Sequence, residues 1–172
     1  MAHSVELLLD PDADRAIRGV WDILAEAGVR SQAAHRAPSN RPHVTMTVSA
    51  AISGVVDAEL AEAAATLPLP CRIGAPILFG SGPFTLARLV VPSAELLRLH
   101  AQIYRICLPH MPSGAFAHAE PGHWTPHVTL ARRLDAALLE KAMPLAGVEI
   151  DGTFAGLRRW DGDARHEYRF DV

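Results

Sequence analysis

The tetrapeptide Pro-His-Val-Thr occurs twice in this chain of 172 residues, at 42–45 and again at 126–129. Each copy enters a run typical of a β-strand, HVTMTVSA at 43–50 and HVTLARRL at 127–134. A motif that recurs at such a distance indicates two related halves. We therefore expect the chain to be built from two similar units, each with a strand that starts with the same motif.

Strand-like and helix-like segments alternate along the chain, and two polar stretches at 31–42 and 110–126 are expected to be loops. The expected strands span 4–10, 43–50, 72–79, 84–91, 127–134, 148–157 and 166–172. The expected helices span 11–27, 56–67, 94–107 and 135–143. This mixed, partly repeated order favours an α+β fold of two pseudo-symmetric lobes, with antiparallel sheets around a central cleft. The length suits a single domain over 1–172, made of these two lobes.

The composition restricts the partners that the chain can have. It is 49% hydrophobic and 20% charged, which is typical of a folded protein. A net charge of −3 argues against a protein that holds long nucleic acids through a basic face. No apolar run approaches the ~20 residues of a membrane span, and Glu6 and Asp10 interrupt any signal peptide. We expect a cytoplasmic protein without a membrane or obligatory protein partner, with a monomer as the default.

The two motifs place chemically useful side chains together. Residues i and i+2 of a strand point to the same face, so His43 lies beside Thr45 and His127 beside Thr129. If the two strands are neighbours in space, these four side chains converge on one cleft. Two imidazoles can act as general acid and general base, and two hydroxyls can donate to the oxygens of a phosphate. The pattern predicts cleavage of a phosphodiester without a metal or cofactor.

These motifs resemble the paired His-x-Thr-x signatures of the two-histidine (2H) phosphoesterase superfamily. The segment PHVTLAR at 126–132 is particularly similar to the 2′-5′ RNA ligase and RNA 2′,3′-cyclic phosphodiesterase branch. The resemblance implies a bilobal α+β fold and hydrolysis of 2′,3′-cyclic phosphates or 2′,5′ linkages in a nucleotide or RNA terminus. It also implies that His127 activates water and His43 protonates the leaving oxygen. Ligation, the reverse of hydrolysis, is a secondary expectation.

Four further side chains near the motifs are candidates for substrate binding. Arg132 stands where the family often has an arginine, but regular alternation from His127 would turn it to the opposite face of the strand. Trp124 could stack on a base, although packing in the core is the favoured role. Phe116 is a weaker stacking candidate, and Arg41 is either a phosphate contact or a solvated loop charge.

Two alternatives stay open at this point. The first is a non-catalytic module that binds an RNA end or a nucleotide in the same cleft. The second is a zinc-dependent hydrolase that uses His110, His118 and His123, although these histidines lack the close spacing of typical zinc ligands.

Overall fold

The computed structural model describes residues 1–171, and the side chains of residues 1–170, and its seven strands form one open sheet. The strands are β1 (His3–Leu9), β2 (His43–Ser49), β3 (Leu69–Phe79), β4 (Phe84–Val90), β5 (His127–Leu134), β6 (Ile150–Asp161) and β7 (His166–Asp171). Their order is β2-β1-β6-β3-β4-β5, with β7 paired to β6, and each of these pairs is antiparallel. The predicted α+β class is confirmed, although the strands of both lobes join in one sheet. Val172, the end of the last predicted strand, lies outside the described residues.

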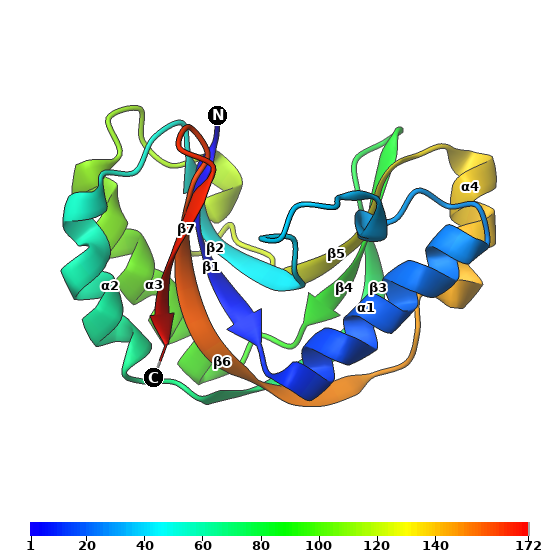
Figure 1. Ribbon diagram of the computed structural model, residues 1–172, viewed down its shortest axis with the longest axis horizontal. Helices are drawn as coiled ribbons and strands as arrows, with labels where there is room; N and C mark the ends of the chain where they lie inside the picture. Colours follow the sequence, from blue (N-terminus) through cyan, green and yellow to red (C-terminus); the bar gives the residue numbers. More distant parts are fainter. Residues whose placement is uncertain (172) are drawn as a thin grey trace.

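The long strand β6 joins the two halves of the sheet. Its first residues, 150–154, pair with β3, whereas residues 154–160 pair with β1. Strand β7 pairs with residues 156–161, on the edge of β6 that β3 occupies further back. In Figure 1, β6 is the orange ribbon that curves beneath the molecule from one half to the other.

Four helices flank the sheet, and the two longest are exchanged between its halves. They are α1 (Pro11–Glu26), α2 (Asp57–Ala64), α3 (Ala94–Cys107) and α4 (Ala136–Ala142). Figure 1 shows α2 and α3 on one flank and α1 and α4 on the other. Helix α1 follows β1 but reaches across to β5, whereas α3 follows β4 but packs against β2. No helix within residues 1–171 is long and apolar enough to cross a membrane.

The apolar core lies between these helices and the sheet. Helix α1 has one buried stripe at helical spacing, formed by Ala13, Ile17, Val20, Trp21 and Leu24. Helix α3 has a similar stripe, formed by Leu96, Leu99, His100, Ile103 and Cys107. Because the helices cover one side of the sheet, the other side is free to form a cleft.

Several element boundaries differ from the sequence prediction, including the start of β3 at Leu69 and the end of α2 at Ala64. Asp10, expected at the end of the first strand, instead caps α1, and its carboxylate accepts hydrogen bonds of 2.9 Å from the backbone N–H groups of Asp12 and Ala13. Strand β6 continues past 157 to Asp161, because its last residues pair with β1 on one edge and with β7 on the other.

Strand β2 contains a β-bulge directly after its motif threonine. Thr45 lies opposite Glu6, and Thr47 lies opposite Val5, the preceding residue of β1. Met46 is therefore an extra residue without a partner of its own, as expected in a bulge.

Strand β5 contains the same irregularity. Thr129 lies opposite Ala87, and Ala131 lies opposite Leu86, so that Leu130 is the extra residue. An extra residue reverses the alternation of side chains beyond it. The sixth residue of each strand, Val48 on β2 and Arg132 on β5, consequently faces the same side as the histidine at the first position.

Candidate active site

A cavity of about 640 Å³ is lined by β2 and β5, the strands at the two ends of the sheet order. His43, Thr45 and His127 line this cavity. Thr129 lines an adjoining cavity of about 40 Å³, together with His43 and Arg132, which also line the larger one. The larger cavity is also lined by six aromatic side chains: Phe79, Phe116, His118, His123, Trp124 and Trp160. The structure thus brings the two motifs, 84 residues apart in sequence, to one opening.

The backbone before each motif orients its imidazole. Nδ1 of His43 lies 2.8 Å from the carbonyl oxygen of Arg41, and Nδ1 of His127 lies 2.7 Å from that of Thr125. A carbonyl only accepts hydrogen bonds, so Nδ1 carries the hydrogen in both rings. The proline between the two partners holds the preceding residue in an extended conformation, which fixes the carbonyl. Each ring therefore has Nε2 available for proton transfer.

Glu6 on β1 places a carboxylate beside the first motif. Its Oε1 lies 3.7 Å from Nε2 of His43 and accepts a hydrogen bond of 2.6 Å from Ser4. Its Oε2 accepts hydrogen bonds from Arg158, with a shortest distance of 2.7 Å. Burial alone would raise the pKa of Glu6, but the charges of His43 and Arg158 outweigh it and lower the pKa. Glu6 is therefore an anion at neutral pH, held against His43.

His127 has different surroundings. The ring of Phe79 lies 4.6 Å from the imidazole, centroid to centroid, at an angle of 51°. Burial lowers the pKa of His127, and the charges of Arg132, His43 and His118 add to this effect, whereas a backbone hydrogen bond partly opposes it. His127 is therefore neutral at pH 7, with a lone pair on Nε2. Two identical sequence motifs thus hold their histidines in unlike electrostatic environments.

Two tryptophans brace the motif threonines in a crossed arrangement. The indole of Trp21 on α1 donates to the carbonyl oxygen of Thr129 at 3.1 Å, and the indole of Trp124 donates to that of Thr45 at 2.9 Å. Both carbonyls lie on edge strands, next to the bulges, where a backbone group has no ladder partner on the outer side. The indole N–H groups satisfy them and connect each motif to a segment from the other end of the chain.

Trp124 packs against helix α3 and also lines the larger cavity. Its ring stacks on that of His100, with centroids 3.9 Å apart and an angle of 2° between the planes. The ring also lines the larger cavity, so one face is covered by α3 and the indole N–H is engaged by Thr45. Phe116, the weaker stacking candidate, lines the same cavity and is 44% exposed.

The two arginine candidates are placed differently from each other. Arg132 lines both cavities, because the bulge at Leu130 turns it to the histidine face, and the regular alternation expected from the sequence is wrong here. The side chain of Arg41 lines a separate cavity and lies 3.5 Å from Glu167. Arg41 bonds to His43 through its backbone carbonyl.

Within the described residues, His110, His118 and His123 belong to no group of three possible metal ligands. His118 and His123 line the larger cavity, and His110 does not. Within residues 1–170, the one cluster of three possible ligand atoms close enough to share an ion is formed by His3, Asp161 and Asp163. It contains none of the loop histidines, so the donor geometry does not support the zinc alternative.

Sequence reasoning missed three residues at this site: Glu6, Phe79 and Trp160. The signal for Glu6 was a single acid among the apolar residues of SVELLLD, two positions after Ser4. Phe79 precedes the turn that joins β3 to β4, and nothing in its local sequence indicated a contact with His127.

Comparisons with known proteins agree with this arrangement. A model of the 2′-5′ RNA ligase superfamily matches residues 9–163, which is most of the chain. Among curated proteins, none matches the chain. The structure is similar to that of Kluyveromyces marxianus Usb1 with uridine monophosphate, at 13% identity and a TM-score of 0.54, over 99% of this chain and 98% of that one.

Two further solved structures have the same fold. One is TT0787 of Thermus thermophilus, at 16% identity and a TM-score of 0.52, over 100% of this chain and 95% of that one. The other is described as a phosphoesterase, at 16% identity and a TM-score of 0.51, over 99% and 94%. The fold, the paired motifs and the family match lead to the same conclusion: the chain belongs to the 2′-5′ RNA ligase superfamily.

Proposed function

We propose that this protein hydrolyses a cyclic or 2′,5′-linked phosphodiester of a nucleotide or RNA terminus, through paired histidines and without a metal ion. The observation that carries the proposal is the placement of His43 and His127 on one cavity, each with Nδ1 bonded to a carbonyl. Membership of the 2′-5′ RNA ligase superfamily supports phosphodiester chemistry. The solved structure of Usb1 with uridine monophosphate shows that a protein of this fold accepts a nucleotide.

The unlike surroundings of the two histidines support a division of roles. His127 has a lowered pKa and is the base, taking a proton from water as the water oxygen attacks phosphorus. His43 has a carboxylate oxygen of Glu6 3.7 Å from its Nε2, and we assign it the role of the acid. As the bond from phosphorus to the ribose oxygen breaks, His43 gives its proton to that oxygen. The products are a phosphate monoester and a free hydroxyl.

The motif hydroxyls and one arginine serve the phosphate itself. Thr45 and Thr129, which line the two adjoining cavities, donate hydrogen bonds to its non-bridging oxygens, which gain negative charge in the transition state. Arg132 carries a planar, forked donor that suits the same oxygens. The aromatic lining of the larger cavity, with Phe116 and Trp160, suits a nucleobase.

The test is turnover of a nucleoside 2′,3′-cyclic phosphate in the presence of EDTA. We expect the wild-type protein to open the ring, and His43→Ala and His127→Ala each to lower kcat by about 10²- to 10⁴-fold. His166→Ala, at an exposed histidine on β7, is the matched control. Wild-type rates in both cavity variants would refute the mechanism.

The same experiment separates the alternatives. Nucleotide binding without turnover in the wild-type protein would identify a binding module instead of an enzyme. Activity that EDTA abolishes would point to a metal-dependent hydrolase.

A further inference from the structure

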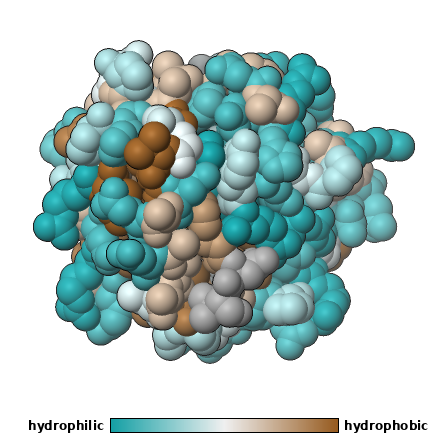
Figure 2. All heavy atoms as spheres, turned by 60° about the vertical axis from the view of Figure 1, so that its left-hand side comes forward, coloured by the Kyte–Doolittle hydropathy of each residue, from teal (hydrophilic) through white to brown (hydrophobic). Residues whose placement is uncertain are grey.

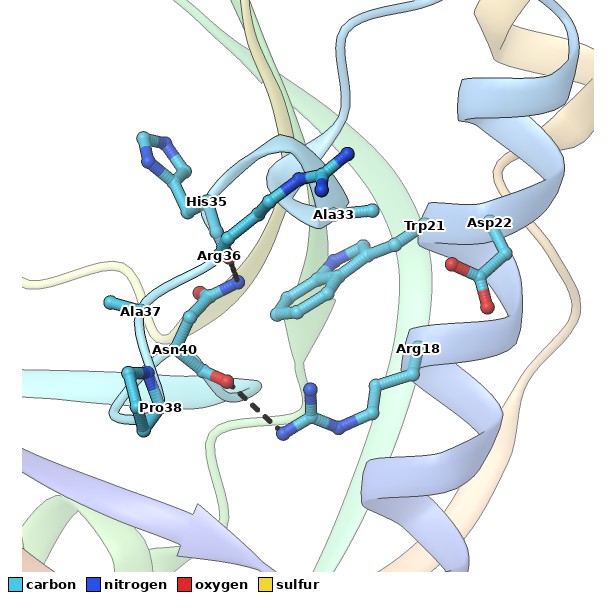
Figure 3. A pocket seen from close by; sticks show the side chains of 9 residues that line it. All are labelled: Arg18, Trp21, Asp22, Ala33, His35, Arg36, Ala37, Pro38 and Asn40. Carbon is cyan, nitrogen blue, oxygen red and sulfur yellow. Dashed lines mark hydrogen bonds between the residues drawn. The ribbon is translucent and has the colours of Figure 1, made fainter.

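A second cavity, of about 420 Å³, adjoins the proposed reaction site. It is lined by Arg18, Trp21, Asp22, Ala33, His35, Arg36, Ala37, Pro38 and Asn40. Trp21 and Asn40 also line the small cavity that holds His43, Thr129 and Arg132. The two cavities therefore lie on either side of Trp21 and Asn40, which line both of them. Figure 3 shows it between helix α1 and the loop that leads into β2, with the ring of Trp21 at its centre.

The hydrogen-bond donors of this cavity suit an anion. Arg18 comes from α1 and Arg36 from the loop, and Figure 3 shows their guanidinium groups on opposite sides of the Trp21 ring. His35 adds an imidazole, and Asp22 is the one acid among the lining residues. Because Asp14 pairs with Arg18, the lining offers an anion the remaining donors of Arg18 and the guanidinium of Arg36. Figure 2 shows the opposite flank of the molecule, where hydrophobic and hydrophilic side chains are interspersed.

Arg18 is already held in place. Its Nε donates to Asp14 at 2.6 Å, and its Nη2 donates to the carbonyl oxygen of Asn40 at 3.2 Å. Its guanidinium carbon lies 5.7 Å from the centre of the Trp21 ring. A guanidinium fixed in this way loses little conformational entropy when it binds a further oxygen.

Arg36 is exposed, and within residues 1–170 its side chain makes no hydrogen bond or ion pair. All of its donors are therefore free for a ligand. The loop that carries it is nevertheless fixed, since the side chain of Asn40 donates to the carbonyls of Gln32 and His35 at 2.9 and 2.8 Å. Ser31 also anchors the start of the loop, by donating to the carbonyl oxygen of Trp21 at 2.6 Å.

We propose that this cavity binds a second phosphate group of the same substrate whose phosphodiester reacts at His43 and His127. The proposal rests on the function proposed above and names the class of substrate: one with a further phosphate about one nucleoside away from the reacting one. Forked guanidinium groups are the preferred protein donors for phosphate oxygens, and an internal phosphate of an RNA chain and the terminal phosphate of a small nucleotide share this chemistry. A nucleoside cyclic phosphate alone leaves the cavity empty.

Four substrates test the proposal and separate the two sources. They are a nucleoside 2′,3′-cyclic phosphate, the same compound with a 5′-phosphate, a dinucleotide that ends in the cyclic phosphate, and that dinucleotide with a neutral methylphosphonate linkage. We expect the wild-type protein to favour the substrates with a second charged phosphate by about tenfold in kcat/KM, mainly through KM. The methylphosphonate compound is expected to behave like the mononucleotide. A preference for the 5′-phosphate compound over the dinucleotide would identify small nucleotides as the source, and the reverse would identify an RNA end.

Arg36→Ala is expected to remove this preference, so that the ratio of the kcat/KM values with and without the second phosphate falls to about one. Arg15→Ala is the matched control, because Arg15 is an exposed arginine of α1 that pairs with Asp12 and lines none of the cavities described here. Rising salt is expected to reduce the wild-type preference, since screening weakens exposed charge pairs.

Three results would overturn the proposal: no wild-type preference, an unchanged preference in Arg36→Ala, or full preference for the methylphosphonate compound. The function proposed above fails separately, when the wild-type protein hydrolyses none of the four substrates. In that case, calorimetric binding of the same four compounds decides the present proposal, with the same ratios of Kd expected for the wild-type protein and Arg36→Ala.

Discussion

Nε2 of His43 lies 3.7 Å from a carboxylate oxygen of Glu6, whereas the charged groups that act on His127 are Arg132 and two other histidines. Two copies of one tetrapeptide therefore provide one imidazole that faces an anion and one that faces cations. This asymmetry comes from the surroundings of each strand, such as Glu6 on β1, and not from the motifs themselves. It makes the proposed roles of acid and base testable.

Replacing Glu6 with glutamine removes the charge and keeps the shape. We expect Glu6→Gln to lower kcat/KM by about 10-fold across the pH profile, because the anion that faces Nε2 of His43, the proposed acid, is lost while the site keeps its shape. The matched control is Glu167→Gln, which removes the other carboxylate bonded to Arg158, at 2.6 Å, and leaves Glu6 in place. A Glu6→Gln profile identical to that of the wild-type protein would contradict the role of Glu6.

Arg132 is expected to act both on the substrate phosphate and on His127, the proposed general base. We expect Arg132→Gln to lower kcat/KM by about 10- to 100-fold, through the loss of a charge-assisted hydrogen bond. Because the charge of Arg132 helps to lower the pKa of His127, its removal raises that pKa and moves the acidic limb of the profile to higher pH. Arg133→Gln, at the next residue, is the control because Arg133 lines neither cavity of the site. Equal effects of the two substitutions would contradict a special role for Arg132 as the arginine that the bulge turns toward the cavity.

The crossed tryptophans are expected to stabilise the site through their indole N–H groups. Trp124→Phe removes the donor to Thr45 and keeps an aromatic ring beside His100, so we expect a loss of about 1–2 kcal/mol in the free energy of unfolding. Trp160→Phe is the control, because within the described residues its indole donates no hydrogen bond although it lines the same cavity. Denaturant midpoints measure both changes, and an equal loss in the two variants would show that only ring packing matters.

Stability is expected to fall as the solution becomes acidic. Burial lowers the pKa values of His100 and His127 in the folded protein, so the unfolded chain binds more protons below about pH 6.5. The free energy of unfolding then decreases with falling pH, by up to about 1.4 kcal/mol per unit for each histidine. His100→Gln is expected to reduce this slope, and His166→Gln, at an exposed site, to leave it unchanged. Urea titrations between about pH 5 and 8 measure it, and a slope unaffected by His100→Gln would contradict the prediction.

The parts of this architecture that depend on local patterns could be predicted from the sequence. The repeated tetrapeptide indicated that two strands begin alike, and alternation placed His43 and His127 on the same face as their threonines. Helical spacing located α1 and α3 closely. These features depend on residues only a few positions apart, which is the range over which periodicity is informative.

The parts that depend on pairing between strands could not be predicted in this way. The bulge at Leu130 is a property of β4 and β5 together, and it decides that Arg132 faces the cavity. The contact of Glu6 with His43 depends on which strand lies beside β2. The side chain of Arg41 lies beside Glu167 on β7 and not in the cavity of the motifs, and this contact also depends on distant residues.

The exchange of α1 and α3 has a consequence for how the molecule holds together. A fragment that ended after β2 would contain α1 without β5, and its strand β2 would have no α3 to cover it. The second fragment would have the opposite defect. Neither piece could exclude water from its apolar surface alone, so the cavity between the motifs exists only while the two halves of the chain are packed together.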